Sequence, residues 1–334
     1  MGLARCLALS DDGYDSVMTS FGLTLSSEEH APRRLVELGA LAEQHGFDFV
    51  SISDHFHPWV DAQGHSPFVW SVLGALAERT STIEVGVGVT CPIMRIHPVV
   101  MAQAAATTGQ LLDGRFTWGV GTGEALNEHI TGERWPIAPD RIAMLAEAID
   151  VIRQLWTGEE VTFRGDHFTV ENARIYDPPT SAIPIVVSAF GPAAAKMAAE
   201  SGDGLWTGGD PEIIETWKQA GGSGPVWSQI TLCWAEQEDE AVELAHRVWP
   251  NSGVPGQLSQ DLPTPKHFEQ ASSIVTKEMI KESLACGPDV DRIISEIRDA
   301  VSAGVDHVYL HQIGDDQEGF CRVWSDQIAP AVCS

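Results

Sequence analysis

Residues 81–121 read STIEVGVGVTCPIMRIHPVVMAQAAATTGQLLDGRFTWGVG and contain a complete strand–helix–strand pattern. The valine-rich run 81–90 predicts a buried strand. Residues 97–114 carry apolar side chains at helical spacing and end in an Asp-Gly pair, which predicts a helix. Residues 115–121 predict the next strand. A strand, a helix and a strand in this order are typical of a parallel βαβ unit.

The same alternation continues along the chain. Further strands are predicted at 21–25, 47–53, 184–190, 203–208, 226–235 and 307–314. Further helices are predicted up to Gly46, at 66–80, at 141–158 and from Gly191 onward. Eight strands with helical connections favour a (β/α)₈ TIM barrel over an open sheet.

Two segments interrupt this rhythm. Residues near 159–180 include a stretch that alternates like a hairpin. Residues 250–285 are rich in proline and polar side chains, and we expect them to form an insertion over one face of the barrel. No shift in composition marks a second unit, so residues 1–334 are predicted to form a single barrel domain.

The charge balance excludes several classes of partner. Lys and Arg number 20 and Asp and Glu number 47, which gives a net charge of −27. Such an acidic surface repels phosphate backbones and anionic membranes, so we expect no nucleic acid and no membrane partner. No apolar run is long enough to span a bilayer. A small-molecule substrate is the remaining expectation.

Cysteine spacing gives no sign of a metal site. The six cysteines are scattered and form no CxxC pair. We therefore expect no metal ion, and we expect reduced thiols in a cytoplasmic protein.

Chemically distinctive residues follow three of the predicted strands. SDHFHPW (53–59) follows the second, GTGEALNE (121–128) the fourth and SAFGP (188–192) the fifth. Active sites of TIM barrels lie at the carboxyl ends of the strands, so these segments are expected on one face. The imidazole of His55 suits general acid–base catalysis, although a histidine after a strand is more often a structural hydrogen-bonding residue.

The glycine-dense segment around Glu124 has two interpretations. Glycines allow the backbone to approach a flat ring or a phosphate closely, and Glu124 could then serve as a proton donor. A carboxylate favoured by a helix N-terminus is the alternative. The helix-start amides after Gly191 could hold a phosphate, and a plain strand–helix turn is equally compatible.

Taken together, SDHFHPW, GVGVTCP, GTGEALNE and SAFGP resemble the luciferase-like (β/α)₈ oxidoreductases that use coenzyme F420, an 8-hydroxy-5-deazaflavin. The resemblance runs from about Phe21 to about Pro330 and is closest to the glucose-6-phosphate dehydrogenase branch. It implies coenzyme F420 as cofactor, with FMN as the less favoured alternative. It also implies a homodimer.

The resemblance implies a role for each matched position. His55 takes the proton of a substrate alcohol, Trp59 lies beside the reacting carbon, and Glu124 donates a proton or stabilises charge near N1 of the deazaflavin. Gly88-Val89 matches a strand-end bulge with a non-proline cis peptide. The cofactor-binding positions are Asp54, Gly88, Val89, Thr122, Gly123, Glu124, Asn127, Ser188, Ala189 and Gly191. The substrate-pocket positions are Glu28, Trp59, Phe190, Trp206, Ser259 and Ser283.

The phosphate-binding positions of that branch do not match. They fall near Asp210-Pro211 and on Ser259 and Ser283, and none is basic here. A buried phosphate without a cationic partner is strongly unfavourable. The sequence therefore predicts hydride transfer between C5 of the deazaflavin and an uncharged alcohol or carbonyl, rather than oxidation of glucose 6-phosphate.

Three alternatives stay open. Lys277 and Lys281 could supply relocated phosphate ligands for a sugar-phosphate dehydrogenase. An FMN-dependent luciferase-like monooxygenase has the same fold, and a coenzyme-binding carrier without turnover would keep the same binding residues.

Arg95 could hold the acidic tail of the coenzyme, or it could be a surface arginine.

Overall fold

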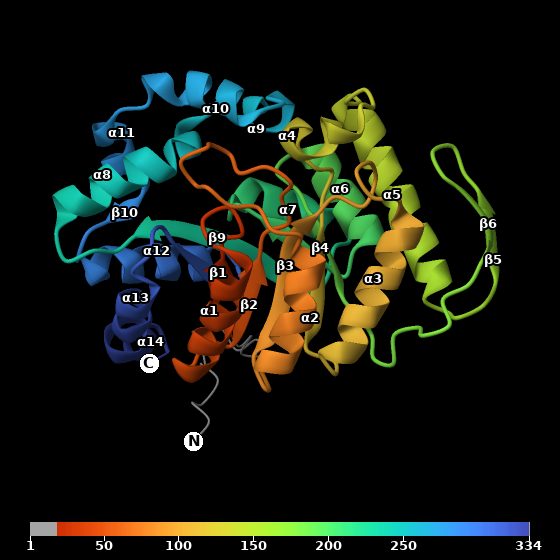
Figure 1. Ribbon diagram of the computed structural model, residues 1–334, viewed down its shortest axis with the longest axis horizontal. Helices are drawn as coiled ribbons and strands as arrows, with labels where there is room; N and C mark the ends of the chain where they lie inside the picture. The colour runs from red at the N-terminus through yellow and green to blue at the C-terminus, as the bar shows by residue number, and fades with distance from the viewer. Residues whose placement is uncertain (1–18, 334) are drawn as a thin grey trace.

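A closed barrel of parallel strands forms the centre of the molecule (Figure 1). The computed structural model describes residues 19–333. Within them, neighbouring barrel strands follow the order β1-β2-β3-β4-β7-β8-β9-β11, and β11 pairs with β1 to close the barrel. The strands are β1 (Ser20–Leu25), β2 (Phe49–Ile52), β3 (Glu84–Thr90), β4 (Phe116–Val120), β7 (Ile185–Ser188), β8 (Gly204–Thr207), β9 (Val226–Cys233) and β11 (His307–Gln312). The predicted (β/α)₈ barrel is confirmed.

Helices connect successive strands and surround the barrel (Figure 1). The helices of the first half are α1 (Pro32–Gln44), α2 (Val69–Arg79), α3 (Pro98–Leu111), α4 (Ala125–Glu128), α5 (Ala138–Leu155), α6 (Pro192–Ser201) and α7 (Pro211–Gln219). Those of the second half are α8 (Glu238–Val248), α9 (Leu258–Asp261), α10 (Pro265–Ala271), α11 (Lys277–Ser283), α12 (Val290–Ser302), α13 (Gln317–Val323) and α14 (Ala329–Val332). Proline stands in the first turn of several of them, where its missing N–H leaves no hydrogen bond unmade.

The alternation of side chains along each strand creates two cores. Outward-facing residues such as Val50, Leu205 and Val308 join the large core between barrel and helices. The inward-facing neighbours form a separate cluster of Phe49, Val186, Trp206, Trp227 and Tyr309. Because successive side chains point to opposite faces of a strand, neighbours in sequence enter different cores. The inner cluster fills the barrel, so the barrel is a packed core and not a pore.

The aromatic rings inside the barrel require small neighbours. A Cβ atom on Gly22 would lie 2.3 Å from the ring of Phe49, and one on Gly88 would lie 2.3 Å from the indole of Trp206. The indole Nε1 of Trp206 donates to the hydroxyl of Tyr309 at 2.5 Å. These contacts fix the aromatic floor on which the cavity described below rests.

Both predicted insertions are present. β5 (Val161–Arg164) and β6 (Thr169–Ala173) form an antiparallel hairpin at the periphery (Figure 1). The segment from η2 (Pro250–Gly253) to α11, which includes η3 (Ser272–Ile274), lies over the end of the barrel that carries α4. The short strand β10 (Ala285–Cys286), which the sequence pattern did not predict, pairs with β9.

The helix boundaries and the cysteines differ in part from expectation. α1 begins only at Pro32, so residues 26–31 form a loop above the first strand. Cys333 is disulfide-bonded, so the prediction of reduced thiols was wrong for this residue, because spacing in sequence does not reveal which segments meet in space. Cys6 lies outside the described residues. The free and buried cysteines among the others are Cys91, Cys233, Cys286 and Cys321.

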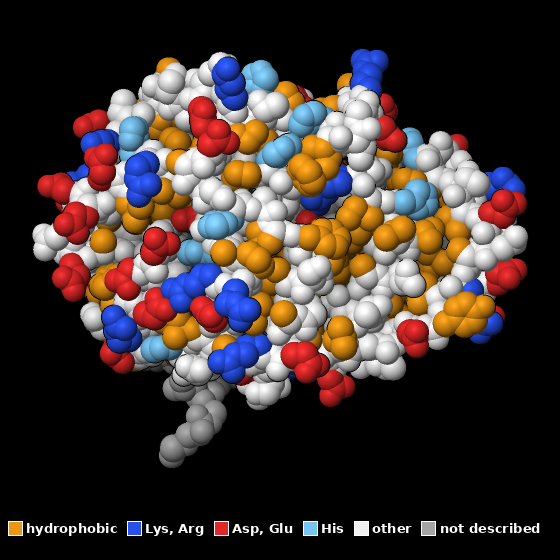
Figure 2. Space-filling model, in the orientation of Figure 1, with side chains coloured by type: hydrophobic (Ala, Val, Ile, Leu, Met, Phe, Trp, Pro, Cys, Tyr) orange, Lys and Arg blue, Asp and Glu red, His pale blue; other side chains and the backbone are white. Residues whose placement is uncertain are grey.

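The surface carries charges of both signs. On the face shown in Figure 2, acidic side chains are spread widely instead of gathering into one patch. Among the described residues, no helix has the combination of length and apolar composition that a membrane span requires. The single domain and the homodimer stay predictions.

Candidate active site

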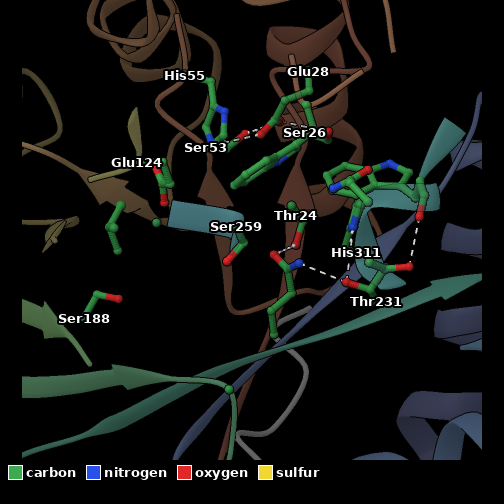
Figure 3. Close-up of a pocket in the computed structure, with 18 of the residues that line it drawn as sticks. Thr24, Ser26, Glu28, Ser53, His55, Glu124, Ser188, Thr231, Ser259 and His311 are labelled. Atoms are coloured by element: carbon green, nitrogen blue, oxygen red, sulfur yellow. Dashed lines mark hydrogen bonds and ion pairs between the residues drawn. The ribbon is translucent and has the colours of Figure 1, made fainter. Parts of the chain in front are cut away.

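A cavity of about 410 Å³ opens at the carboxyl ends of the barrel strands (Figure 3). Trp206 and Tyr309 of the inner cluster contribute to its floor, and Phe268 of the 250–285 insertion contributes to its wall. Every barrel strand, or the loop after it, supplies at least one lining residue. Taken in strand order, examples are Thr24, Ser53, Val89, Glu124, Ser188, Thr207, Thr231 and His311.

His55 faces the cavity from the loop after β2, as the sequence predicted. Its Nε2 lies 3.4 Å from Glu28 Oε1, and its Nδ1 lies 3.2 Å from the carbonyl oxygen of His57. Its ring packs against Trp59, with 4.9 Å between the ring centroids. In the protonated imidazole, both N–H groups would thus have an acceptor.

Three hydroxyl groups hold Glu28, which is buried. Its Oε2 accepts from Ser53 Oγ at 2.6 Å, Ser26 Oγ at 3.1 Å and Ser27 Oγ at 3.5 Å. The remaining oxygen, Oε1, is the one that faces His55 Nε2. Glu28 was predicted as a pocket residue, and its serine partners were not.

Glu124 stands on the other side of His55, after β4 and at the start of α4. The amide of Asn127 lies between the two: its Nδ2 is 3.1 Å from His55 Nδ1 and 3.4 Å from Glu124 Oε2. Its Oδ1 accepts from the backbone N–H groups of Phe56 and His57, at 2.9 and 3.1 Å. Because these two donors fix the orientation of the amide, Nδ2 is the atom that faces both His55 and Glu124, and it donates to Glu124 Oε2.

A buried charge cluster supports this wall. Arg95 donates to Asp54 Oδ1 at 2.9 Å, and its Nε lies 3.7 Å from Glu128 Oε1. Burial raises the pKa of Glu128 to about 7, against the opposing effect of Arg95. The alternative that Arg95 is a surface arginine was wrong, because its side chain is buried between the two carboxylates.

The predicted cofactor positions divide into two groups. Gly88, Val89, Glu124 and Ser188 line the cavity. The Gly88-Val89 peptide bond is cis, and β3 is irregular in register there, which confirms the predicted bulge. The other predicted positions lie behind or beside the cavity wall and are not among its lining residues. They are Asp54, Thr122, Gly123, Asn127, Ala189 and Gly191.

Buried oxygen atoms at this end without a hydrogen-bond partner among the described residues include Asp54 Oδ2, Thr90 Oγ1 and Thr207 Oγ1. Of these three, only Thr207 belongs to a residue that lines the cavity. A buried polar atom without a hydrogen bond is costly, so such atoms commonly mark the place of a ligand. Among residues 19–333, no group of three or more His, Cys, Asp or Glu side chains is arranged to hold a metal ion.

The predicted substrate residues line the cavity with one exception. Glu28, Trp59, Phe190, Trp206 and Ser259 are all in its wall. The prediction for Ser283 was wrong. This residue ends α11, which packs on α8, and its hydroxyl returns to the carbonyl of Ile280.

The lysines that could have replaced the missing phosphate ligands also lie elsewhere. Lys277 pairs with Glu243 and Lys281 with Glu238, and all four side chains are about half exposed. Asp210 caps α7 through the backbone N–H of Glu212. No Lys or Arg is among the described residues that line the cavity.

Sequence reasoning missed one whole wall of the cavity. The residues of this wall carry polar groups and come from β1, β9 and β11: Thr24, Gln229, Thr231 and His311. They stand within strands, at positions that an alternation of apolar and polar residues does not distinguish from solvent-facing ones. The only signal in the sequence was that polar residues stand near the carboxyl ends of these strands.

Comparison with known proteins gives a consistent result. Residues 16–307 match the family model described as luciferase-like monooxygenase. The chain is 36% identical to F420-dependent glucose-6-phosphate dehydrogenase 1 of Rhodococcus jostii, over 95% of this chain and 99% of the relative. It is also 36% identical to the F420-dependent glucose-6-phosphate dehydrogenase of Mycobacterium tuberculosis, over 93% of this chain and 97% of that protein.

A solved structure shares the fold closely. It is an F420-dependent secondary alcohol dehydrogenase in complex with an F420-acetone adduct, and it superimposes with a TM-score of 0.87 at 32% identity. The match covers 94% of this chain and 99% of that one.

Proposed function

The chain belongs to the luciferase-like monooxygenase family, and from this premise we propose that it is a coenzyme-F420-dependent oxidoreductase acting on an uncharged alcohol or carbonyl. The observation that carries the proposal is the convergence of His55, Glu124 and the Gly88-Val89 bulge on one cavity at the barrel mouth. In the oxidising direction, the substrate loses a hydride from carbon and a proton from oxygen, and the carbonyl compound forms.

The residues beside Glu124 fit the deazaflavin. Thr207 offers an unpartnered hydroxyl, and Ser188 offers a second hydroxyl in the cavity wall. When bound, the coenzyme supplies a carbon, C5, that accepts or returns a hydride. The bulge at Gly88-Val89 provides the apolar wall of this end.

His55 is proposed as the base. With its proton at Nδ1 shared with the carbonyl of His57, Nε2 has a free lone pair that takes the proton of the substrate hydroxyl. The Glu28 carboxylate then stabilises the imidazolium that results. Trp59 packs on the ring and restricts its orientation.

Glu124 is proposed to supply a proton, or a compensating charge, to the coenzyme ring on the opposite side. Asn127 Nδ2 lies between Glu124 and His55, so its amide positions both groups. Placing one proton acceptor and one proton donor in a single cavity lets hydride and proton movements occur without bulk water.

The charges around the cavity support an uncharged substrate. Glu28 and Glu124 line it, and no Lys or Arg does so within the described residues. A phosphate dianion here would face carboxylates without a cationic partner, which is strongly unfavourable. The names of the relatives indicate both possibilities, since two act on glucose 6-phosphate and the solved structure on a secondary alcohol.

A titration of the apo-protein with oxidised coenzyme F420 and, separately, with FMN tests the coenzyme assignment. We expect tight binding of the deazaflavin and weak binding of FMN. The opposite preference, with oxygen consumption in the presence of reduced flavin, would favour the monooxygenase alternative. Deazaflavin binding with turnover of glucose 6-phosphate and not of uncharged alcohols would favour a sugar-phosphate dehydrogenase.

A further inference from the structure

The wall of the cavity formed by β1, β9 and β11 has no part in the chemistry above. Thr24, Gln229, Thr231 and His311 line it, and in Figure 3 Thr231 and His311 lie on the side away from Glu124 and Ser188. A wall that only had to enclose a hydrocarbon chain would be apolar. Four polar side chains here therefore indicate a polar group on the ligand.

A buried carboxylate fixes the proton positions in this wall. Glu29 does not line the cavity, and it accepts from His311 Nε2 at 2.8 Å, Trp249 Nε1 at 2.6 Å and the N–H of Gly314 at 2.8 Å. Burial alone would raise the pKa of Glu29, but the hydrogen bond and charge of His311, together with the Gly314 N–H, lower it overall. Because a carboxylate oxygen accepts, the 2.8 Å contact places a proton on His311 Nε2.

The remaining nitrogen of His311 faces the cavity wall. In the tautomer that carries its single proton on Nε2, Nδ1 has a lone pair and accepts hydrogen bonds. Its nearest donor is Thr231 Oγ1 at 3.4 Å, and that hydroxyl itself accepts from Gln229 Nε2 at 3.0 Å. Thr24 Oγ1 lies 3.4 Å from Gln229 Oε1.

Two of these contacts are long. At 3.4 Å the Thr231–His311 and Thr24–Gln229 hydrogen bonds are well beyond the usual distance between two such groups. Each leaves an acceptor, His311 Nδ1 or Gln229 Oε1, beside a hydroxyl that can rotate. A ligand hydroxyl fits such a place, because it donates to the acceptor and accepts from the threonine.

We infer that this wall binds a second hydroxyl group of the substrate, so that the substrate is a small uncharged diol or polyol. The inference rests on the proposed function and names its substrate class. The hydroxyl at His55 is the one oxidised, and the hydroxyl at Thr231 and His311 is held unchanged. Carboxylate and phosphate groups fit poorly, because Glu29 lies directly behind His311, and because Glu28 and Glu124 line the cavity while none of its described lining residues is Lys or Arg.

The test compares alcohols that differ by the second hydroxyl. With purified protein and oxidised coenzyme F420, kcat/KM is measured for propane-1,2-diol, glycerol and erythritol, and for propan-2-ol and butan-2-ol. Thr231→Val removes the hydroxyl with little change in shape, and Thr231→Ser restores it. Thr216→Val, on the exposed face of α7, is the matched control.

We expect the diols and polyols to exceed the monohydroxy alcohols in kcat/KM by roughly tenfold or more, the size of a good hydrogen bond. Thr231→Val should lower kcat/KM for the diols and polyols roughly tenfold more than kcat/KM for propan-2-ol, and Thr231→Ser should keep the preference. Thr216→Val should leave kcat/KM unchanged for all of these alcohols. Titration with the deazaflavin shows that each variant is folded.

Three outcomes overturn the inference while leaving the coenzyme assignment intact. They are equal kcat/KM for both alcohol classes, an equal loss for both in Thr231→Val, and deazaflavin binding without oxidation of any diol or polyol. Failure to bind the deazaflavin would instead overturn the proposed function, and the inference with it.

Discussion

Asn127 Nδ2 lies 3.1 Å from His55 Nδ1, within hydrogen-bond distance of the proposed base. The same nitrogen is 3.4 Å from Glu124 Oε2, so one amide touches both proposed proton-transfer groups. When Asn127 donates to His55, it competes with the arrangement in which Nδ1 gives its own proton to the carbonyl of His57. The amide therefore influences which ring nitrogen of His55 carries the proton.

Asn127→Asp should change the pH dependence of turnover. The substitution keeps an acceptor for the N–H groups of Phe56 and His57, loses the Nδ2 donor and adds a negative charge. An added carboxylate stabilises protonated His55, so we expect the acidic limb of the kcat/KM profile to move to higher pH, with a lower kcat. An unchanged profile at reduced kcat would limit Asn127 to a structural role.

His55→Ala should abolish most turnover without loss of coenzyme binding. Removing a positioned general base typically costs about 10²–10⁴-fold in rate. The measurement is kcat together with a fluorescence titration of the deazaflavin. His65→Ala, an exposed histidine ten positions further on, is the control and should keep both values. Full activity in His55→Ala would remove the base assignment.

Glu124→Gln should alter one limb of the pH–rate profile. Glutamine has a similar shape and leaves a contact to Asn127 possible, but it has no proton to give. If Glu124 donates a proton to the coenzyme ring, the alkaline limb of kcat should disappear in the variant, and kcat should fall. A profile identical to that of the wild type would show that Glu124 does not transfer a proton.

Gly88→Ala should destabilise the apo-protein. Its Cβ would lie 2.3 Å from Trp206 and 2.8 Å from Ser51 Oγ, and overpacking of this kind typically costs about 1–3 kcal/mol. Gly74→Ala in α2 is the matched control, because nothing lies within 4 Å of a Cβ there. It should stabilise the protein by about 0.5–1 kcal/mol. Both are measured by denaturant unfolding, and equal effects of the two substitutions would contradict the packing account.

Glu128→Gln should change how stability depends on pH. Burial raises the pKa of Glu128 from 4.5 to about 7. Between pH 4.5 and about pH 7, the folded protein therefore holds a proton on Glu128 that the unfolded chain has released. The stabilisation from this group is complete below pH 4.5 and is lost as the pH rises through about 7, by on the order of 3 kcal/mol. The free energy of unfolding of the variant minus that of the wild type should therefore be larger at pH 8 than at pH 5. The free energy of unfolding of both proteins at these two pH values checks the sign.

Much of the site could be predicted from local sequence. His55, Trp59 and Glu124 stand directly after predicted strands, and the barrel rule places all strand ends on one face. Gly88-Val89 was found through resemblance alone. Ser283 was misplaced because its position was inferred by alignment across an insertion, whose path depends on packing against α8.

The sequence by itself determined the barrel, the face that carries the chemistry, and the residue types available there. These follow from periodicity and strand order, which are local properties of the chain. The tertiary structure decided which groups meet: Ser53 with Glu28, Asn127 with His55, and His311 with Glu29, a pair 282 residues apart. Such partners depend on how the strands align and close into a barrel, because a shift of one residue would turn each side chain to the opposite face. Periodicity predicts a strand, but only the closed barrel fixes which side chains of other strands and loops that strand contacts.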